Sequence, residues 1–184
     1  MADTQTPQGV LAVVRQKHYS LEDVIKEKPA CLMILETIQD PGNLGTILRA
    51  GEGAGVTGIV MDKNTVDIYN PKVIRSTMGS VFRMPFVYVE DLHDALRGKK
   101  QEKIRLFAAH LKGTNSYDQE DFTGSCGFLI GNEANGLTDE TAALADTYIR
   151  IPMMGKVESL NAAVASSVLM FEAARQRRNS KNSL

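Results

Sequence analysis

The sequence has few cysteines, no excess of charge of either sign and no long hydrophobic run. Its two cysteines, Cys31 and Cys126, are too few for a metal cluster and lie in apolar segments, which predicts buried, reduced thiols. Lys and Arg total 21 and Asp and Glu 22, so the net charge of −1 argues against bulk electrostatic binding of nucleic acid, although not against a local basic patch. No apolar run approaches the roughly 20 residues of a membrane span, and the N-terminus lacks the regions of a signal peptide. We therefore expect a soluble, cytoplasmic, reduced protein without a metal.

The chain of 184 residues is 43% hydrophobic, which is enough for one domain with a full core. Short apolar runs alternate with helical patterns, and this predicts an α/β fold with a mostly parallel sheet flanked by helices. The expected strands cover residues 10–14, 31–36, 57–61, 86–89, 105–109, 127–130 and 147–151. The expected helices cover residues 44–54, 72–79, 91–97, 139–145 and 160–177. Residues 1–8 are expected to be a polar arm, and the basic tail 175–184 favours a frayed helix end, flexible from 179, over an RNA-contacting tail.

Several common site motifs are missing. The glycines from Gly51 to Gly55 fail the dinucleotide-binding pattern, because position 56 is valine and the glycines end a helix instead of opening one. There is no phosphate-binding P-loop and no nucleophile elbow. His18, His93 and His110 have no metal-ligand spacing; the first two are expected to be solvated, and His110 follows a strand end.

Three polar segments follow expected strands, where open α/β sheets bind ligands. In segment 40–49, Asn43 is expected to cap the helix that carries Arg49, although an ordinary capped helix with a surface arginine would look the same. In segment 128–137, Glu133 is a candidate site carboxylate, with a plain connecting loop as the alternative. Gly131 there permits unusual backbone conformations.

Segment 151–165 begins at a strand end and passes through a loop into a helix rich in small residues. Ser159 is expected to cap this helix, and its small side chains would allow close packing against another segment. Asn161 lies in the first expected turn, where helix propensity alone would not favour it. For Ser159 taken by itself, a purely structural cap is the better interpretation.

Together and in this order, these segments resemble the SpoU/TrmH-type RNA 2′-O-ribose methyltransferases of the SPOUT superfamily. The matching stretches are N-L-G-T-I-L-R at 43–49, G-N-E-A-N-G-L at 131–137 and I-P-M-M-G-K-V-E-S-L-N-A-A-V-A at 151–165. Residues 70–80, with Phe82, also resemble a family stretch. The resemblance runs from about residue 10 to residue 177, nearly the whole chain.

The resemblance implies a single SPOUT domain with a C-terminal deep trefoil knot, working as a homodimer with the active site near the interface. The knot loops would bind S-adenosyl-L-methionine, partly through the backbone, which implies cofactor contacts at Ala109, Gly131, Ile151, Met153 and Leu160. Arg49 matches the family's key catalytic position. The other polar active-site positions match Asn43, Glu133, Ser159 and Asn161, which we expect to orient Arg49 and the ribose.

The implied activity is methylation of a ribose 2′-hydroxyl in RNA, with ribosomal RNA of the 23S type as the expected substrate and S-adenosyl-L-homocysteine as the product. Because arginine is always protonated, chemistry favours Arg49 stabilising an alkoxide or gripping a phosphate; the role of base would need an unusual environment. Alternatives are a transfer-RNA methyltransferase, a non-catalytic RNA-binding or ribosome-assembly module, and a nucleotide-dependent oxidoreductase, which lacks its fingerprint. Larger relatives carry an N-terminal RNA-binding domain, so we expect this chain to be a catalytic domain more than a minimal enzyme.

Overall fold

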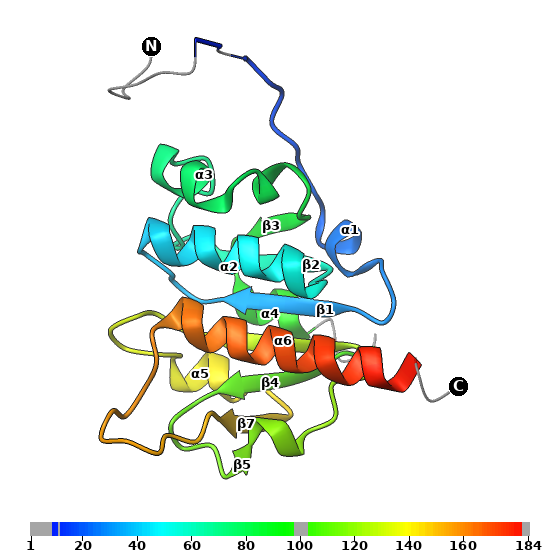
Figure 1. The fold of residues 1–184 in the computed structure, drawn as a ribbon, viewed down its shortest axis with the longest axis vertical. Coiled ribbons are helices and arrows are strands. Elements are labelled where there is room, and N and C mark those ends of the chain that lie inside the picture. The colour runs from blue at the N-terminus through cyan, green and yellow to red at the C-terminus, as the bar shows by residue number, and fades with distance from the viewer. Residues whose placement is uncertain (1–8, 11, 98–102, 182–184) are drawn as a thin grey trace.

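The computed structural model describes residues 9–10, 12–97 and 103–181, and at its centre lies a sheet of seven strands. The strands lie in the order β3-β2-β1-β6-β4-β7-β5, and every neighbouring pair is parallel (Figure 1). Their bounds are β1 (Cys31–Leu35), β2 (Gly58–Asp62), β3 (Phe86–Val89), β4 (Arg105–Ala109), β5 (Asn115–Ser116), β6 (Cys126–Ile130) and β7 (Thr147–Arg150). The predicted α/β fold with a parallel sheet is therefore confirmed.

Helices cover both faces of the sheet, and alternate strand side chains supply the two cores. Met33 and Leu35 pack into one core, whereas Leu32 and Ile34 pack into the other. The first core is covered by α2 (Pro41–Ala54), α3 (Pro71–Thr77) and α6 (Ala162–Lys181), which lie in front of the sheet in Figure 1. The second is covered by α1 (Leu21–Ile25), α4 (Leu92–Arg97) and α5 (Asp139–Ala142). Two 3-10 helices, η1 (Ser80–Phe82) and η3 (Tyr117–Gln119), lie in the connections after α3 and β5.

Six of the predicted strands are confirmed, but the one predicted at 10–14 is wrong. Val10 and Val13 are 89% and 94% exposed, and residues 10 and 12–14 pair with no described strand. Their β-branched side chains favour extended chain, yet with no core face to bury, the segment has no reason to join the sheet. Residue 11 lies outside the described residues.

Besides the two 3-10 helices, one short helix and one short strand were not predicted from the sequence, because neither is long enough to show a period. Helix α1 depends on a capping box, in which Ser20 accepts from the Asp23 N–H and Asp23 accepts from the Ser20 N–H. Strand β5 has only two residues, both polar.

Two helices are capped by residues other than those predicted. Asp40, not Asn43, caps α2, with its carboxylate accepting from the Asn43 N–H at 2.8 Å. Pro41 then occupies the first turn, where a missing N–H costs nothing. Asn161, not Ser159, caps α6: its Oδ1 accepts from the N–H groups of Ala163 (2.9 Å) and Val164 (3.3 Å). The Asn43 side chain is thus left available for a different contact.

The C-terminal helix continues further than expected, as regular helix through Lys181, and residues 182–184 lie outside the described part. Arg177 explains this order, since its guanidinium donates to the main-chain oxygens of Ala30 (2.8 Å), Phe122 (3.0 Å) and Gly124 (2.7 Å). Cys31 and Cys126 are neighbours in register on β1 and β6, and both are buried free thiols as predicted. Among the described residues, no helix combines the length and apolar character needed to cross a membrane.

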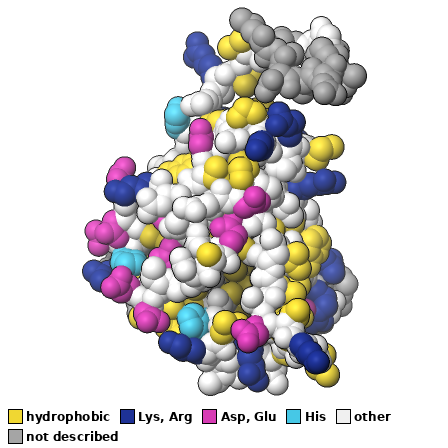
Figure 2. All heavy atoms as spheres, turned by 90° about the vertical axis from the view of Figure 1, so that its left-hand side faces the viewer, with side chains coloured by type: hydrophobic (Ala, Val, Ile, Leu, Met, Phe, Trp, Pro, Cys, Tyr) yellow, Lys and Arg dark blue, Asp and Glu magenta, His cyan; other side chains and the backbone are white. Residues whose placement is uncertain are grey.

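The strand order reverses between β1 and β6. The chain leaves β1 for α2 on one face of the sheet, and it leaves β6 for α5 on the other face. In parallel α/β sheets, ligands bind outside the carboxyl ends of the strands at such a reversal. Figure 2 looks onto the side toward which the arrowheads of Figure 1 point, and this side carries both signs of charge and exposed hydrophobic atoms.

Candidate functional site

Glu133 joins the two loops that leave the sheet at this reversal. Its Oε1 accepts from Asn43 Nδ2 at 2.9 Å and from the Asp40 N–H at 3.1 Å. Its Oε2 accepts from the Gln39 N–H at 3.2 Å. One carboxylate from the loop after β6 therefore receives three donors from the loop after β1 and the start of α2.

Asn43 extends this contact to a third segment. It is buried, 8% exposed, and its Oδ1 accepts from Asn161 Nδ2 at 2.9 Å. Asn161 uses its own Oδ1 to cap α6, so its amide is fixed in orientation. These three side chains are called the Asn43–Glu133–Asn161 network. In the sequence, Glu133 lies 90 positions and Asn161 lies 118 positions after Asn43. The structure thus brings together three of the five polar residues singled out from the sequence.

The pKa of Glu133 reflects two opposing effects. Partial burial raises the pKa of the carboxyl, but the hydrogen bonds from Asn43 and from backbone N–H groups, including those of Asp40 and Gln39, outweigh it and lower the pKa. Glu133 is therefore an ionised acceptor at neutral pH. It can hold donors in place, and it is poorly suited to giving up a proton.

Arg49 and Ser159 stand apart from the network. Arg49 lies six residues after Asn43 on α2, which places it about 9 Å further along the helix and on a different side. Its side chain is exposed and makes no hydrogen bond or ion pair with any described residue. Ser159 is also exposed and has no such partner in the described chain. Arg49 is consequently a free guanidinium, available to an anion from outside the protomer.

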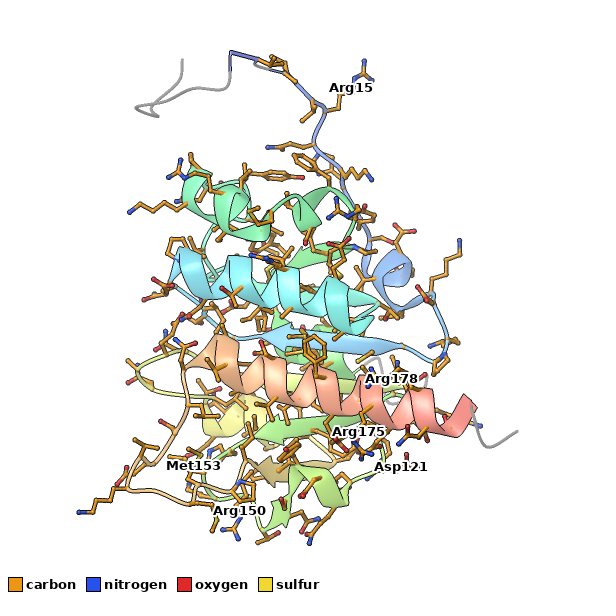
Figure 3. The ribbon with its side chains drawn as sticks, viewed as in Figure 1. Arg15, Asp121, Arg150, Met153, Arg175 and Arg178 are labelled. Carbon is orange, nitrogen blue, oxygen red and sulfur yellow. The ribbon has the colours of Figure 1, made fainter. Side chains whose placement is uncertain are left out.

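The residues expected to contact a cofactor gather at the ends of three adjacent strands. Ala109 is the last residue of β4, while Gly131 and Ile151 directly follow β6 and β7. These strands lie in the order β6-β4-β7, so their carboxyl ends are neighbours. Met153 and Leu160 lie near the two ends of the segment between β7 and α6; Figure 3 labels Met153 on it.

The segment 152–160 makes no hydrogen bond with any described residue. Met154 and Val157 on it are 99% and 60% exposed. A nine-residue segment with free main-chain groups and exposed apolar side chains is suited to contacts from outside the protomer.

Gly131 is tightly constrained by the turn that follows it. A Cβ added there would lie 2.1 Å from both the Gly136 carbonyl carbon and the Leu137 nitrogen. The approach is close because the chain folds back on itself: the Gly136 N–H donates to the Asn132 oxygen at 2.8 Å, and Gly136 has φ 71°. Only glycine fits at position 131 without displacing main chain.

Asn132 contributes to the loop and was not singled out from the sequence. Its Nδ2 donates to the Thr37 oxygen at 2.8 Å, and its Oδ1 accepts from the N–H groups of Ala134 and Asn135. An asparagine between a strand end and a glycine turn is a typical signal for such side-chain to backbone bonds, so the sequence did contain this information.

The histidines fall into three different settings. His18 is exposed, as predicted, but His93 is partly buried and lies 2.9 Å from the Thr141 hydroxyl, so the prediction of a solvated His93 is wrong. His110 stacks at a tilt against Tyr148 and accepts from the Lys112 N–H at 3.0 Å. In the described part of the chain, no group of three or more acidic, cysteine or histidine side chains could hold a metal ion.

Comparisons with known proteins agree on one family. The sequence model described as the SpoU rRNA Methylase family matches residues 30–171. The chain is 38% identical over 148 residues to a 23S rRNA (guanosine-2′-O-)-methyltransferase of Xanthomonas axonopodis pv. citri, covering 80% of this chain and 59% of the relative. It is 30% identical over 177 residues to a 23S rRNA (guanosine(2553)-2′-O)-methyltransferase of Bacillus subtilis, covering 93% and 66%. The chain therefore spans about two thirds or less of the length of these two relatives.

Solved structures give the same result. The SpoU methyltransferase AviRb of Streptomyces viridochromogenes superposes with a TM-score of 0.81 at 31% identity, over 88% of this chain and 65% of that one. An AdoMet-bound rRNA methyltransferase from Sinorhizobium meliloti has a TM-score of 0.81 at 35% identity, over 87% and 61%. At these identities the similarity extends beyond the general fold.

Proposed function

Because this chain belongs to the SpoU rRNA methylase family, we propose that it transfers a methyl group from S-adenosyl-L-methionine to a ribose 2′-hydroxyl of ribosomal RNA, in the cytoplasm. The observation that carries this proposal is the Asn43–Glu133–Asn161 network at the reversal of the sheet. Its Asn43 lies on α2, the helix that also presents the unpartnered Arg49 side chain. Its polar residues come from three distant segments, and a purely structural turn would need none of these pairings.

The loops fit the cofactor. Main chain after β4, β6 and β7 would surround it at Ala109, Gly131 and Ile151, with Met153 and Leu160 on the segment before α6. Gly131 allows the main chain after β6 to lie close to the main chain of Gly136 and Leu137, as a tight pocket needs. Segment 152–160 has main-chain groups free to bind the cofactor. The cofactor, when bound, supplies a methyl group already activated by a sulfonium. We further propose that the segment before α6 forms the trefoil knot of the family.

The protein's own task is then alignment and removal of a proton. The 2′-oxygen would form a bond to the methyl carbon as the sulfur–carbon bond breaks and a neutral thioether leaves, and the hydroxyl proton would pass to solvent water. Arg49 would lie against the negative charge that develops on the 2′-oxygen, or against the adjacent phosphate, where a fixed cation lowers the barrier. The Asn43–Glu133–Asn161 network would hold α2, and through it Arg49, relative to the cofactor loops.

A homodimer is part of this proposal. Helices α2 and α6 pack side by side, and their outer surface exposes apolar side chains: Val164 is 48% and Phe171 49% exposed. Gly53 of α2 lies beside Phe171, and a bulkier residue at position 53 would keep another surface from lying flat against these two helices. A second copy of the chain would cover this surface and segment 152–160.

The RNA would lie partly on α3, which packs against α2. The side chains of Lys72 and Arg75 on α3 are exposed and have no partner among the described residues, and Phe82 nearby is 47% exposed. Asp67 is the exposed carboxylate just before this helix. Cations beside an exposed aromatic ring are typical of surfaces that bind single-stranded RNA.

We expect the Lys72→Ala, Arg75→Ala double variant to raise the KM for RNA about ten-fold, because two phosphate contacts are lost. Its affinity for S-adenosyl-L-methionine should not change. The salt dependence of RNA binding should also weaken, by about 1.5 in the log–log slope. Filter binding over a salt series measures this, with Lys26→Ala as the matched control for an exposed lysine on the other face. An unchanged slope would place the RNA elsewhere.

Asn43→Ala should lower the rate of methyl transfer about 100-fold while the fold persists. The amide aligns Glu133 and Asn161, and misplacement of a site by about 1 Å can cost this much. Initial rates and thermal melting measure the two effects, with Asn64→Ala as a control for loss of an amide outside the network. If melting collapsed together with activity, Asn43 would have a structural role only.

The function itself is tested by incubating the protein with S-adenosyl-L-methionine labelled in the methyl group and with unmodified ribosomal or transfer RNA. We expect label in ribosomal RNA, and resistance of the labelled linkage to alkali, because a 2′-O-methyl group blocks alkaline cleavage at that nucleotide. Label in transfer RNA alone would change the substrate. Binding of RNA with no incorporation under any condition would favour a non-catalytic module.

A further inference from the structure

We propose that Glu36 is a positioning residue, which acts on the cofactor through loop 131–138 without touching it. This inference rests on the proposed function, since it takes Gly131 as part of the cofactor site. Glu36 directly follows β1 and is buried, 9% exposed. It belongs to none of the residues considered above for catalysis.

The Glu36 carboxylate accepts hydrogen bonds from Thr138, at the far end of this loop, and from Thr141, in the helix α5 that follows it. Its Oε2 accepts from the Thr138 N–H at 2.8 Å, and its Oε1 accepts from the Thr138 hydroxyl at 2.8 Å. Its Oε1 also accepts from the Thr141 hydroxyl. The donors lie more than 100 residues away in the sequence, 102 for Thr138 and 105 for Thr141.

The chemistry at this position is unusual for a buried acid. No Lys or Arg side chain in the described residues forms an ion pair or a hydrogen bond with Glu36, so three neutral donors replace the water it has lost. Burying a charge is costly unless such bonds are complete. Thr138 also caps α5. The Glu36 carboxylate therefore keeps its three hydrogen bonds only while loop 131–138 and the start of α5 hold this arrangement.

Loop 131–138 is thereby fixed at both ends. At its start, β6 runs in register beside β1, and the Glu36 N–H donates to the Ile130 oxygen at 2.9 Å. In the middle, Asn132 and Glu133 bind the loop after β1. At its end, Glu36 holds Thr138. Since Gly131 lies against Gly136 and Leu137, a shift at Thr138 would be transmitted directly to Gly131.

Glu36→Gln is the most conservative test. Glutamine keeps the shape but removes the charge, so the hydrogen bonds with Thr138 and Thr141 become weaker, neutral ones. We expect the dissociation constant for S-adenosyl-L-homocysteine to rise about ten-fold, as follows from replacing hydrogen bonds to a charged acceptor with neutral ones. The KM for the cofactor should rise likewise, while kcat and the KM for RNA stay within about two-fold.

Hydrogen exchange in the cofactor-free protein provides a measurement that does not depend on activity. Amides 132–138 should exchange at least ten-fold faster in Glu36→Gln, whereas amides of β2 and β3 should be unchanged. Glu36→Asp, which retains a carboxylate, should restore part of the affinity. Glu90→Gln is the control, because Glu90 is exposed and, in the described part of the chain, forms an ion pair with Lys63 alone.

The outcomes separate the two proposals. Unchanged exchange in loop 131–138, or unchanged cofactor affinity with a lowered melting temperature, would show that Glu36 is merely structural. Faster exchange in the variant, together with a wild-type protein that binds no cofactor, would refute the proposed function and leave the loop contact intact. Should Glu36→Gln fail to fold, Thr138→Ala removes the same contacts from the other side and must show the same exchange pattern.

Discussion

Arg49→Ala should abolish methyl transfer while leaving cofactor binding unchanged. The Arg49 side chain is exposed and has no partner within the described residues, so its loss should disturb neither the fold nor the loops after β4, β6 and β7. Removing a group that stabilises charge in a transition state typically costs on the order of 100- to 1,000-fold in rate. Labelled-methyl transfer measures the rate, and calorimetric titration with S-adenosyl-L-homocysteine measures the binding.

Two further variants separate the possible roles of Arg49. Arg49→Lys keeps the charge but loses the planar fork, so it should recover only part of the rate if the guanidinium grips a phosphate in two places. Arg97→Ala removes an exposed arginine of α4 on the opposite face and should have no effect. Near-normal turnover of Arg49→Ala would end the catalytic role that we assign to it.

Gly131→Ala is expected to have the second largest effect, a loss of at least 100-fold in cofactor affinity. The added methyl would lie 2.1 Å from main-chain atoms of Gly136 and Leu137, and main chain cannot rotate away as a side chain can. Loop 131–138 must open, and with it the carboxyl end of β6. Titration with S-adenosyl-L-homocysteine and thermal melting together measure this change.

Gly124→Ala is the matched control, because nothing lies within 4 Å of the Cβ that would be added before β6. It should bind the cofactor as the wild type does. If Gly131→Ala also bound normally, the tight turn would be compatible with a different loop conformation and Gly131 would not belong to the site.

The sheet was predicted well because a strand that is covered on both faces needs apolar side chains on both. Such a strand is a continuous apolar run in the sequence. The runs around Met33 and Phe128 could hardly form anything except central strands. Where the period was short or the local chemistry ambiguous, prediction failed. Asp40 and Asn43 are both good caps three residues apart, and only the preference of Pro41 for the first turn separates them.

The site was harder to predict, since its contacts join distant segments. No local pattern reveals that Asn43 meets Glu133 and Asn161, and only the family resemblance placed the three together. Glu36 shows the limit more clearly. In the sequence it is the polar end of an apolar run, and its three donors become visible only when β1 and β6 are known to be neighbours.

The central claim is that the methyl group goes to a ribose 2′-oxygen, and the position of the label tests it most directly. Ribosomal RNA treated with the protein and S-adenosyl-L-methionine bearing a deuterated methyl group would be digested to nucleosides and analysed by mass spectrometry. We predict that the deuterated methyl appears in the ribose fragment of one nucleoside, and that Arg49→Ala gives none. Label in the base fragment, or no label with a protein that binds the cofactor, would contradict the account.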